Sequence, residues 1–594
     1  MTVHSRRAMV TCAFVGLLMG PTLYFRVASL ESDSINKSNV EHQQRLLARY
    51  GFQLTEAAQV SGVTFVHHPP AIDPRLDPIG PQVAAMGASV AVVDFDRDGW
   101  QDFYVTDSAR GTQNCLYRNL RNGTFTNVAK ELGFLVDNDA IKGACQGSAW
   151  ADINNDGFED VIVYRWGKSE LWLNHGGQQF EFVAESGLPA WANIGCATWL
   201  DYDRDGLIDL FLAGYWPDDV HLENLADTRI MPESFEYANN GGRKWLLRNT
   251  GESRFEDVTE QLGISSTRWT LAVVAADFNH DLYPDLFLSN DYGISELYIN
   301  MQGTAFREQG KDSGIGYAPK SGMNAAVGDV LNQGRLAIYE SNISEEGVLL
   351  QGNNLWVPTG DKALQFDNLA SVMGVELGGW SFGAQFGDLN NDGNLDLYLT
   401  NGYVSGEEGT SYWYDFSQIT GGHSQIISDA RNWPAMRGRS LAGHQTKRVW
   451  LSDGAGAFHD VAQFVGVNDR LDGRAVALAD LSNHGALDIL VANQRGPLLI
   501  YRNTVAEDRH WIDFELTGTQ SNRSAIGAQV RVFWDGQQQL QELVAASGYA
   551  AQNQRRLHFG LGQLPKVDRV EIHWPSGIVQ TLESPAVDQV HRVE

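Results

Sequence analysis

Carboxylate side chains recur along this chain at a spacing that could hold a divalent cation. The first copy places Asp94, Asp96, Asp98 and Asp102 at positions 1, 3, 5 and 9 of one loop, with Gly99 at position 6. Carboxylates at these positions can converge on one ion if the loop curls, and the glycine allows the sharp turn. Calcium prefers hard oxygen ligands of this kind. The spacing therefore predicts a calcium site.

The same pattern returns in four later loops, which begin at Asp152, Asp201, Asp277 and Asp388. In the fourth loop Leu282 stands where the glycine is expected. We expect up to five bound Ca2+ ions, because five loops keep nearly complete sets of oxygen ligands. The predicted metal ligands are Asp94, Asp96, Asp98, Asp102, Asp152, Asn154, Asp156, Asp160, Asp201, Asp203, Asp205, Asp209, Asp277, Asn279, Asp281, Asp285, Asp388, Asn390, Asp392 and Asp396.

Two further copies keep the turn and lose the ligands. The copy that begins at Asp329 offers Leu331 and Gln333 at ligand positions, and the copy that begins at Asp480 offers Ser482. We expect no metal in either loop. The alternative for all the copies is a set of hairpin turns of the Asp/Asn-Gly type without metal. The retained turns indicate that the repeat has a structural origin, to which metal binding was added.

Each loop is flanked by short runs that alternate between apolar and polar residues like strands. A second signature follows, as in residues 116–119 with Phe125: an apolar run that ends near Asn, then a turn and a Phe. After the last loop residues 499–503 keep the run without the Phe, and Phe52 supplies such a tail near the start of the chain. We therefore predict an all-β fold, a seven-bladed β-propeller whose N-terminal strand closes the last blade. An open solenoid is the alternative.

The chain divides into four parts. Residues 1–29 are expected to form a signal peptide or a membrane anchor, residues 30–50 a linker, residues 51–505 the propeller, and residues 508–594 a small β-sandwich domain of short strands with Gly and Pro turns. The first part has a basic start followed by an apolar stretch, which predicts export. We expect a secreted, periplasmic or cell-surface protein that contacts a membrane only through this possible anchor.

Acidic residues outnumber basic residues by 73 to 44, for a net charge of −29. This charge argues against nucleic acid or anionic lipid as a partner. Beyond Cys12 in the apolar segment, three cysteines remain, so one internal disulfide is the most that they can form. Cys145 and Cys196 precede strands of neighbouring blades. They could form a disulfide with each other or remain buried free thiols, and the sequence does not decide between these alternatives. The third is Cys115.

Three stretches of the C-terminal part carry a family resemblance: residues 521–528, the HFGLG run at 558–562 and the WPSG run at 574–577. They resemble the ASPIC/UnbV domain. Together with the upstream FG-GAP/VCBS-type repeats, they make the chain similar to the cartilage acidic protein family. The resemblance implies a secreted or surface-exposed, calcium-binding propeller, and its repeats are similar to those of integrin α-subunit heads. The resemblance implies adhesion or protein recognition, and it identifies no catalytic residue.

Two blade insertions could carry a ligand site. One runs from about residue 215 to 243, and the other from 401 to 446. Aromatic side chains at this density can stack on sugars or anchor a protein, although they can equally pack the insertion onto the propeller. The candidate ligand-binding residues are Tyr403, Tyr412, Trp413 and Trp433.

We expect a calcium-binding recognition or adhesion module for an extracellular or periplasmic protein or glycan. The alternatives are an extracytoplasmic enzyme that uses the central face of the propeller, and a lectin-like carbohydrate-binding protein. The sequence contains no His-Glu-x-x-His motif. Arg523, Arg555 and Arg556 are the cationic candidates of the terminal domain, and we expect them at the surface. The sequence does not indicate an oligomeric state.

Overall fold

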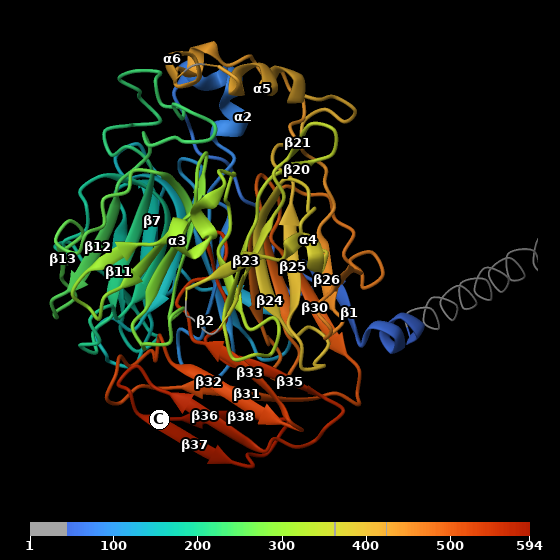
Figure 1. Ribbon diagram of the computed structural model, residues 1–594. Helices are drawn as coiled ribbons and strands as arrows, with labels where there is room; N and C mark the ends of the chain where they lie inside the picture. Colours follow the sequence, from blue (N-terminus) through green and yellow to red (C-terminus); the bar gives the residue numbers. More distant parts are fainter. Residues whose placement is uncertain (1–43, 361–363, 423) are drawn as a thin grey trace, which may run out of the picture.

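The computed structural model describes residues 44–360, 364–422 and 424–594. The predicted signal or anchor over 1–29 and most of the predicted linker lie outside these residues. The fold is all-β and propeller-like: four-stranded antiparallel sheets succeed one another along the chain, and a strand-built C-terminal domain lies against one side of them (Figure 1). Among the described residues, no helix has the length and hydrophobicity to cross a membrane.

Each sequence repeat forms a four-stranded antiparallel unit, called its sheet below; two residue pairs between β10 and β7 join the units of the second and third repeats. The aspartate at position 9 of each of the five predicted metal loops is the first residue of the second strand. The strands of the first six sheets are β2 (Ser89–Val93), β3 (Asp102–Thr106), β4 (Cys115–Asn119) and β5 (Phe125–Asn127); β6 (Gly143–Ala151), β7 (Asp160–Gly167), β8 (Glu170–Asn174) and β9 (Phe180–Phe182); β10 (Ala192–Leu200), β11 (Asp209–Trp216), β12 (Lys244–Asn249) and β13 (Phe255–Asp257); β14 (Trp269–Ala276), β15 (Asp285–Asp291), β16 (Glu296–Asn300) and β17 (Phe306–Glu308); β18 (Ala326–Gly328), β19 (Ala337–Glu340), β22 (Asn354–Pro358) and β23 (Phe366–Asn368); and β24 (Ser381–Gly387), β25 (Asp396–Asn401), β26 (Arg448–Ser452) and β27 (Phe458–Asp460).

The last sheet takes its outer strand from the other end of the chain. Its strands are β28 (Gly473–Ala479), β29 (Asp488–Asn493) and β30 (Leu499–Val505), and β1 (Phe52–Glu56) pairs antiparallel with β30. The sheet therefore has the same four-strand order as the others, although its strands come from both ends of the repeat region.

Neighbouring sheets pack through apolar side chains that alternate along the innermost strands. In β2, Ala91 and Val93 belong to a core that includes Trp150 of the second sheet. The intervening Val90 and Val92 belong to a core shared with Ala475 and Ala477 of the last sheet. Because successive side chains of a strand point to opposite faces, β2 is buried on both sides, and the first and last sheets pack directly on one another.

The C-terminal domain consists of two sheets, with strand orders β35-β31-β38 and β33-β32-β36-β37. In Figure 1 it lies below the propeller-like body, on the side opposite the short helices. Its core merges with that of the second and third repeat sheets, because Ile153 and Ile208 share one apolar cluster with Ile526 and Phe559. The strands are β31 (His510–Leu516), β32 (Gln529–Trp534), β33 (Gln537–Glu542), β35 (Leu557–Gly562), β36 (Arg569–His573), β37 (Val579–Glu583) and β38 (Val590–Val593).

One segment of the C-terminal domain, residues 543–556, leaves it and enters the space between the innermost strands. There β34 (Ala551–Gln552) pairs in parallel with β2. The Gly548 N–H donates to the Ala325 carbonyl at 2.7 Å, and the Gln385 amide donates to the Ser547 carbonyl at 2.6 Å. The segment therefore fills the centre that the sheets surround. No motif in the sequence signalled it.

The side of the body opposite the C-terminal domain carries a cap of short helices (Figure 1). Both insertions take part in it, and its aromatic core also contains Tyr549 from the tip of the central segment. The cap helices are η1 (Pro74–Ile79), α2 (Gly80–Val83), α5 (Trp413–Thr420), α6 (Ser424–Ile427) and η3 (Ala430–Asn432). Elsewhere lie α3 (Gly310–Ser313), η2 (Ile315–Tyr317), α4 (Ala370–Met373), β20 (Ser344–Glu345) and β21 (Leu349–Leu350).

The three described cysteines are free thiols. Of the two alternatives for Cys145 and Cys196, a bridge or free thiols, the structure therefore shows free thiols. Cys145 and Cys196 are buried and Cys115 is half-buried. Burial raises the pKa of Cys196 to about 12, which keeps this thiol protonated and unreactive.

Replacing Gly548 by Ala should lower stability more than the same change at Gly536. Both glycines have positive φ, at 85° and 75°. A Cβ at Gly548 would meet the Gln385 amide nitrogen at 2.6 Å, whereas a Cβ at Gly536 meets nothing within 4 Å. We expect a loss of about 1 kcal/mol for Gly536→Ala and about 2–4 kcal/mol for Gly548→Ala in urea unfolding. Equal losses would show that the central segment does not fit tightly.

Candidate functional site

The first aspartate loop curls around its leading side chain. The Asp94 carboxylate accepts the backbone N–H groups of Asp98 at 3.1 Å and of Gly99 at 2.9 Å. The Asp98 carboxylate in turn accepts the N–H of Trp100 at 2.8 Å. Gly99 has φ 87°, a left-handed conformation that glycine adopts without strain. The loop therefore forms between β2 and β3 in the way its sequence predicted.

In each of two loops, three carboxylates converge. Ligand oxygens of Asp94, Asp96 and Asp102 all lie within 4.8 Å of one another, and the third loop repeats this arrangement at the equivalent positions 1, 3 and 9. Arginines pair with positions 3 and 5 of the first loop: Asp96 forms an ion pair with Arg118 at 3.0 Å, and Asp98 forms one with Arg121 at 2.6 Å. The third-loop residues are Asp201, Asp203 and Asp209, and Arg248 forms ion pairs with both Asp203 and Asp205 at 2.9 Å.

These carboxylates also contain oxygen atoms without a partner. Asp96 Oδ1, Asp102 Oδ2 and Asp201 Oδ1 are buried and have no hydrogen-bond donor. A buried carboxylate oxygen that no donor or cation satisfies costs free energy. A divalent ion at the point where the three groups converge would supply the missing contacts, so these residues fit a hard cation such as Ca2+.

The other three predicted metal loops carry an amide at position 3. The Asn154 amide oxygen accepts the Asp156 N–H at 2.9 Å, and its nitrogen donates to the Asp156 carboxylate at 3.1 Å. Asn279 and Asn390 bond the position-5 aspartates of their own loops in the same way. The amide oxygen remains a possible calcium ligand, and the amide nitrogen orients the next carboxylate.

Burial dominates the electrostatics of the predicted ligands. It raises the pKa of Asp94, Asp201 and Asp388 to about 7 and that of Asp152 to about 6. Carboxylates of the same loop add to the rise in each case. The position-9 groups have pKa values well above the ordinary range, again mainly through burial; they are Asp102, Asp160, Asp209, Asp285 and Asp396. Bound protons or a cation must therefore neutralise the negative charge of these buried carboxylates.

The seventh loop shows what replaces a cation when ligands are lost. Asp480 still accepts the Gly485 N–H at 2.7 Å, so the turn is kept. Its position-9 residue Asp488 forms an ion pair with Arg502 at 2.7 Å. In the fifth loop, Asp329 accepts backbone N–H groups from its own turn and from Leu540 of β33, at 3.1 Å.

The C-terminal domain lies directly on the aspartate loops. The Asp152 N–H donates to the Ser524 hydroxyl at 2.9 Å, and the Asp277 N–H donates to the Glu542 carboxylate at 3.1 Å. His558 of the HFGLG run lies 2.8 Å from the Asn391 amide oxygen in the sixth loop. The motif residues of this domain thus contact the repeat loops. The sequence showed these motifs but not what they touch.

The expectation that the terminal-domain arginines lie at the surface is wrong for two of them. Arg555 forms an ion pair with Glu159 of the second loop at 2.9 Å, and its side chain is 16% exposed. Arg556 is buried and donates to Asn483 in the seventh loop at 2.7 Å. Both belong to the segment that leaves the domain, so the propeller-like body buries them.

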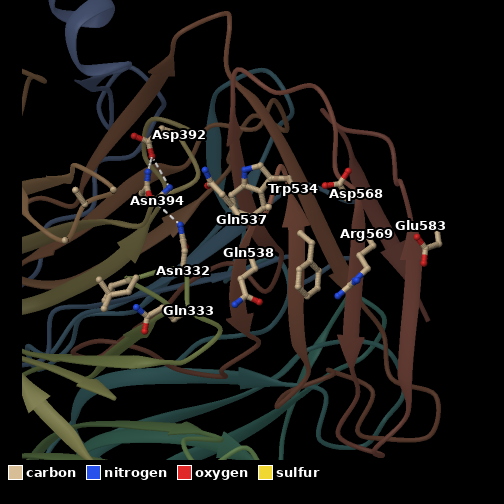
Figure 2. A pocket seen from close by; sticks show the side chains of 17 residues that line it. Asn332, Gln333, Asp392, Asn394, Trp534, Gln537, Gln538, Asp568, Arg569 and Glu583 are labelled. Carbon is tan, nitrogen blue, oxygen red and sulfur yellow. Dashed lines mark hydrogen bonds between the residues drawn. The ribbon is translucent and has the colours of Figure 1, made fainter. Parts of the chain in front are cut away.

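Residues of the fifth and sixth loops and of the C-terminal domain line a polar groove (Figure 2). Its volume is about 1040 Å³. Asn332, Gln333 and Asp392 lie on one side, and Gln537 and Gln538 on the other (Figure 2). The groove could admit a hydrogen-bonding chain, and it borders one predicted metal ligand.

The candidate ligand-binding aromatics are buried in the cap; Tyr403, Tyr412, Trp413 and Trp433 are at most 9% exposed. Tyr403 stacks on Trp380 at 4.3 Å and donates to the Gln82 carbonyl at 2.9 Å. Trp433 donates to the Ile427 carbonyl at 2.7 Å. Their burial favours the alternative, in which these side chains pack the insertion onto the body.

Comparison with known families gives two matches. An FG-GAP-like repeat model matches residues 94–163, 152–212 and 237–288, and the ASPIC and UnbV model matches residues 518–594. The chain carries FG-GAP-like repeats and a C-terminal ASPIC and UnbV domain. This is the combination that the sequence motifs predicted.

One curated relative and two solved structures extend the comparison. The chain is 21% identical over 519 residues to Cartilage acidic protein 1 of Xenopus tropicalis, covering 83% of this chain and 71% of the relative. An Agrocybe aegerita lectin that recognises non-reducing terminal N-acetylglucosamine matches with a TM-score of 0.36 and 14% identity, over 65% of this chain and 84% of the lectin. A rhamnogalacturonan lyase of Bacillus licheniformis matches with a TM-score of 0.35 and 10% identity, over 76% and 75%.

The stabilising effect of calcium should grow between about pH 4 and pH 7. In chelator, the folded protein holds more protons on Asp94, Asp201 and Asp388 than the unfolded chain does, so its free energy of unfolding falls as pH rises. Calcium bound at these carboxylates would replace those protons and remove the loss. We expect the difference between calcium and chelator to widen by several kcal/mol over this range. His67, whose pKa burial lowers to about 3, contributes to both curves alike. A difference independent of pH would contradict the assignment.

Proposed function

We propose that this chain is an extracytoplasmic, calcium-binding recognition module that binds a protein or glycan partner. The convergence of Asp94, Asp96 and Asp102, with two of their buried oxygens unpaired, is the observation that carries the calcium assignment. The FG-GAP-like repeats and the similarity to Cartilage acidic protein 1 support a location outside the cytoplasm.

We further propose that the repeat sheets are the blades of a seven-bladed propeller closed by the N-terminal strand. The pairing of β1 with β30 supports this, because it joins the first strand of the chain to its last repeat. The shared core of the first and last sheets supports it as well. A closed ring leaves only short, protected strand edges.

Calcium would act mainly on stability in this proposal. Each ion would fix one connection between the two inner strands of a blade, on the face that carries the C-terminal domain. Extracellular sites of this kind have dissociation constants near ~0.1–1 mM, so each would contribute roughly 0.5–1.5 kcal/mol at millimolar calcium. The ligands would be those predicted from the sequence, with positions 1, 3 and 9 closest to the ion.

The partner would bind outside the centre. The C-terminal domain covers the loop face, and residues 543–556 fill the space between the inner strands. An enzyme that works at the central face would need that space, so the geometry does not support this alternative. The cap and the groove of Figure 2 remain accessible.

Thermal unfolding of residues 30–594 tests the calcium assignment. We expect the melting temperature to rise by at least about 5 °C between excess chelator and millimolar calcium, because several sites add their binding free energies. Magnesium at the same concentration should have a smaller effect, since it demands a smaller, octahedral site. An equal rise with magnesium, or no rise, would contradict calcium-filled loops.

Two substitutions in the first loop should separate a ligand close to the ion from the position-5 aspartate, which lies farther from it. Asp102 converges with Asp94 and Asp96, whereas Asp98 pairs with Arg121. We expect Asp102→Asn to remove one ion from the stoichiometry measured by calorimetric titration. Asp98→Asn should keep that ion with an affinity lowered less than about tenfold. The same stoichiometry for both variants would show that the position-9 carboxylate does not bind calcium.

A further inference from the structure

We propose that an asparagine in the third strand couples the calcium site of its own repeat to that of the preceding repeat. As a result, the first four loops take up calcium cooperatively, and the sixth loop takes it up independently. This coupling rests on the calcium-binding function proposed above and describes how its sites influence one another. The asparagines belong to the second sequence signature and lie in β4, β8, β12, β16 and β30; they are Asn119, Asn174, Asn249, Asn300 and Asn503.

The side-chain amide of this asparagine bridges two repeats. Asn249 Nδ2 donates to the Ile208 carbonyl of its own loop at 3.1 Å and to the Ile153 carbonyl of the preceding loop at 3.0 Å. The equivalent amides make the same pair of bonds: Asn174 to Glu159 and Phe95, and Asn300 to Pro284 and Tyr202. All three side chains are at most 1% exposed. A buried amide loses free energy if either bond breaks, so each bridge holds two neighbouring loops in register.

The backbone of the same asparagine holds a predicted metal ligand. The Asn249 N–H donates to Oδ1 of Asp209, at position 9 of the third loop, at 2.8 Å. The N–H of Tyr202, at position 2 of that loop, donates to Oδ2 of the same carboxylate at 3.2 Å. Equivalent pairs of donors hold Asp160 and Asp285. Each of these position-9 carboxylates is therefore oriented by a residue that also contacts the preceding loop.

A continuous path thus joins the ligands of neighbouring loops. Position 2 lies between the predicted ligands at positions 1 and 3, so an ion in a loop restrains the position-2 peptide. The carbonyl of that peptide restrains the asparagine of the next repeat, whose N–H orients the next position-9 carboxylate. An ion in one loop therefore pre-orders part of the next loop and lowers the entropic cost of binding there. The effect is reciprocal by linkage, and positive cooperativity follows.

The path is interrupted in the fifth and sixth sheets. In the fifth sheet Pro358 takes the place of the asparagine opposite the phenylalanine of the fourth strand, and its side chain has no donor. In the sixth sheet Ser452 takes that place. The Ser452 N–H keeps its bond to Asp396 at 2.9 Å, but within the described part of the chain no hydrogen bond joins its side chain to the fifth loop. The bridge is thus missing on both sides of the loop that lost its ligands.

The sixth loop has no calcium loop beside it. Asn503 donates to the Leu389 carbonyl of the sixth loop at 2.8 Å, but the seventh loop, to which Asn503 belongs, has lost its ligands. Asn119 likewise reaches back from the first repeat to Leu481 of the seventh loop, at 2.9 Å. The fifth loop on the other side is expected to hold no metal either. The first four loops therefore form one linked series, from which the sixth is isolated.

Calorimetric calcium titration of residues 30–594 tests the coupling. Two position-9 variants form a matched pair: Asp209→Asn should remove the third-loop ion, and Asp396→Asn the sixth-loop ion. Each should lower the stoichiometry by one. After Asp209→Asn, two of the remaining sites should bind about fivefold more weakly, because the second and fourth loops lose a filled neighbour. After Asp396→Asn, the remaining sites should keep their affinities.

A second matched pair tests the asparagine itself. Asn249→Ser introduces the residue that the sixth sheet carries at this place, and it removes the bond between the second and third loops. Asn503→Ser makes the same change in the repeat whose loop lost its ligands. Both should lower the melting temperature in chelator by about 2–4 °C, since each loses buried hydrogen bonds. Only Asn249→Ser should lower the Hill coefficient of calcium binding, which we expect to exceed unity in the unchanged chain.

Three results would overturn the coupling: unchanged affinities of the remaining sites after Asp209→Asn, a Hill coefficient of unity or below in the unchanged chain, or an equal fall in that coefficient for both serine variants. Calcium bound at the expected stoichiometry without coupling would leave the proposed function standing. No calcium binding would overturn both. If Asn249→Ser fails to fold, the pair of aspartate variants still decides the question.

Discussion

The repeat architecture depends on one turn, in which a leading aspartate accepts backbone N–H groups from its own loop. Asp94 bonds Asp98 and Gly99 in this way, and Asp329 and Asp480 keep the same turn although their loops have lost other ligands. The turn fixes the entry into the second strand of each sheet. A metal site then needs only two or three further ligand oxygens, because the loop is already curled. This explains why the turn outlasts the ligands in the degraded copies.

The carboxylates of these turns are buried, and burial makes their negative charge costly. Apolar packing between sheets and the docked C-terminal domain exclude water from the loops, which raises the pKa of Asp94 and Asp201 to about 7. A positive charge must offset this cost. In the seventh loop Arg502 does so for Asp488. In the first loop, Arg121 is paired with Asp98, so the carboxylates of Asp94 and Asp102 depend on a proton or an ion.

Local sequence periodicity predicted the strands, the aspartate turns and the terminal motifs. These features depend on neighbours a few residues apart, so the chain displays them directly; the apolar run Val90–Val93, which forms a strand buried on both faces, is an example. The path of residues 543–556 could not be predicted, because its partners, such as Gln385 and Ala325, are distant in the sequence and carry no motif. For the same reason Arg555 was expected at the surface, although Glu159 of the second loop pairs with it.

The central segment also decides where recognition can occur. In a propeller the centre is a natural ligand site, but here Gly548 contacts the fifth and sixth sheets and Tyr549 reaches the cap. The C-terminal domain thus binds the loop face and the cap at once, which ties the sheets together from inside. Under the proposed recognition function, a partner would approach at the cap or at the groove of Figure 2. The cap insertions bury Tyr403, Tyr412, Trp413 and Trp433 against the body, so these side chains stabilise the cap and are not free to bind a partner.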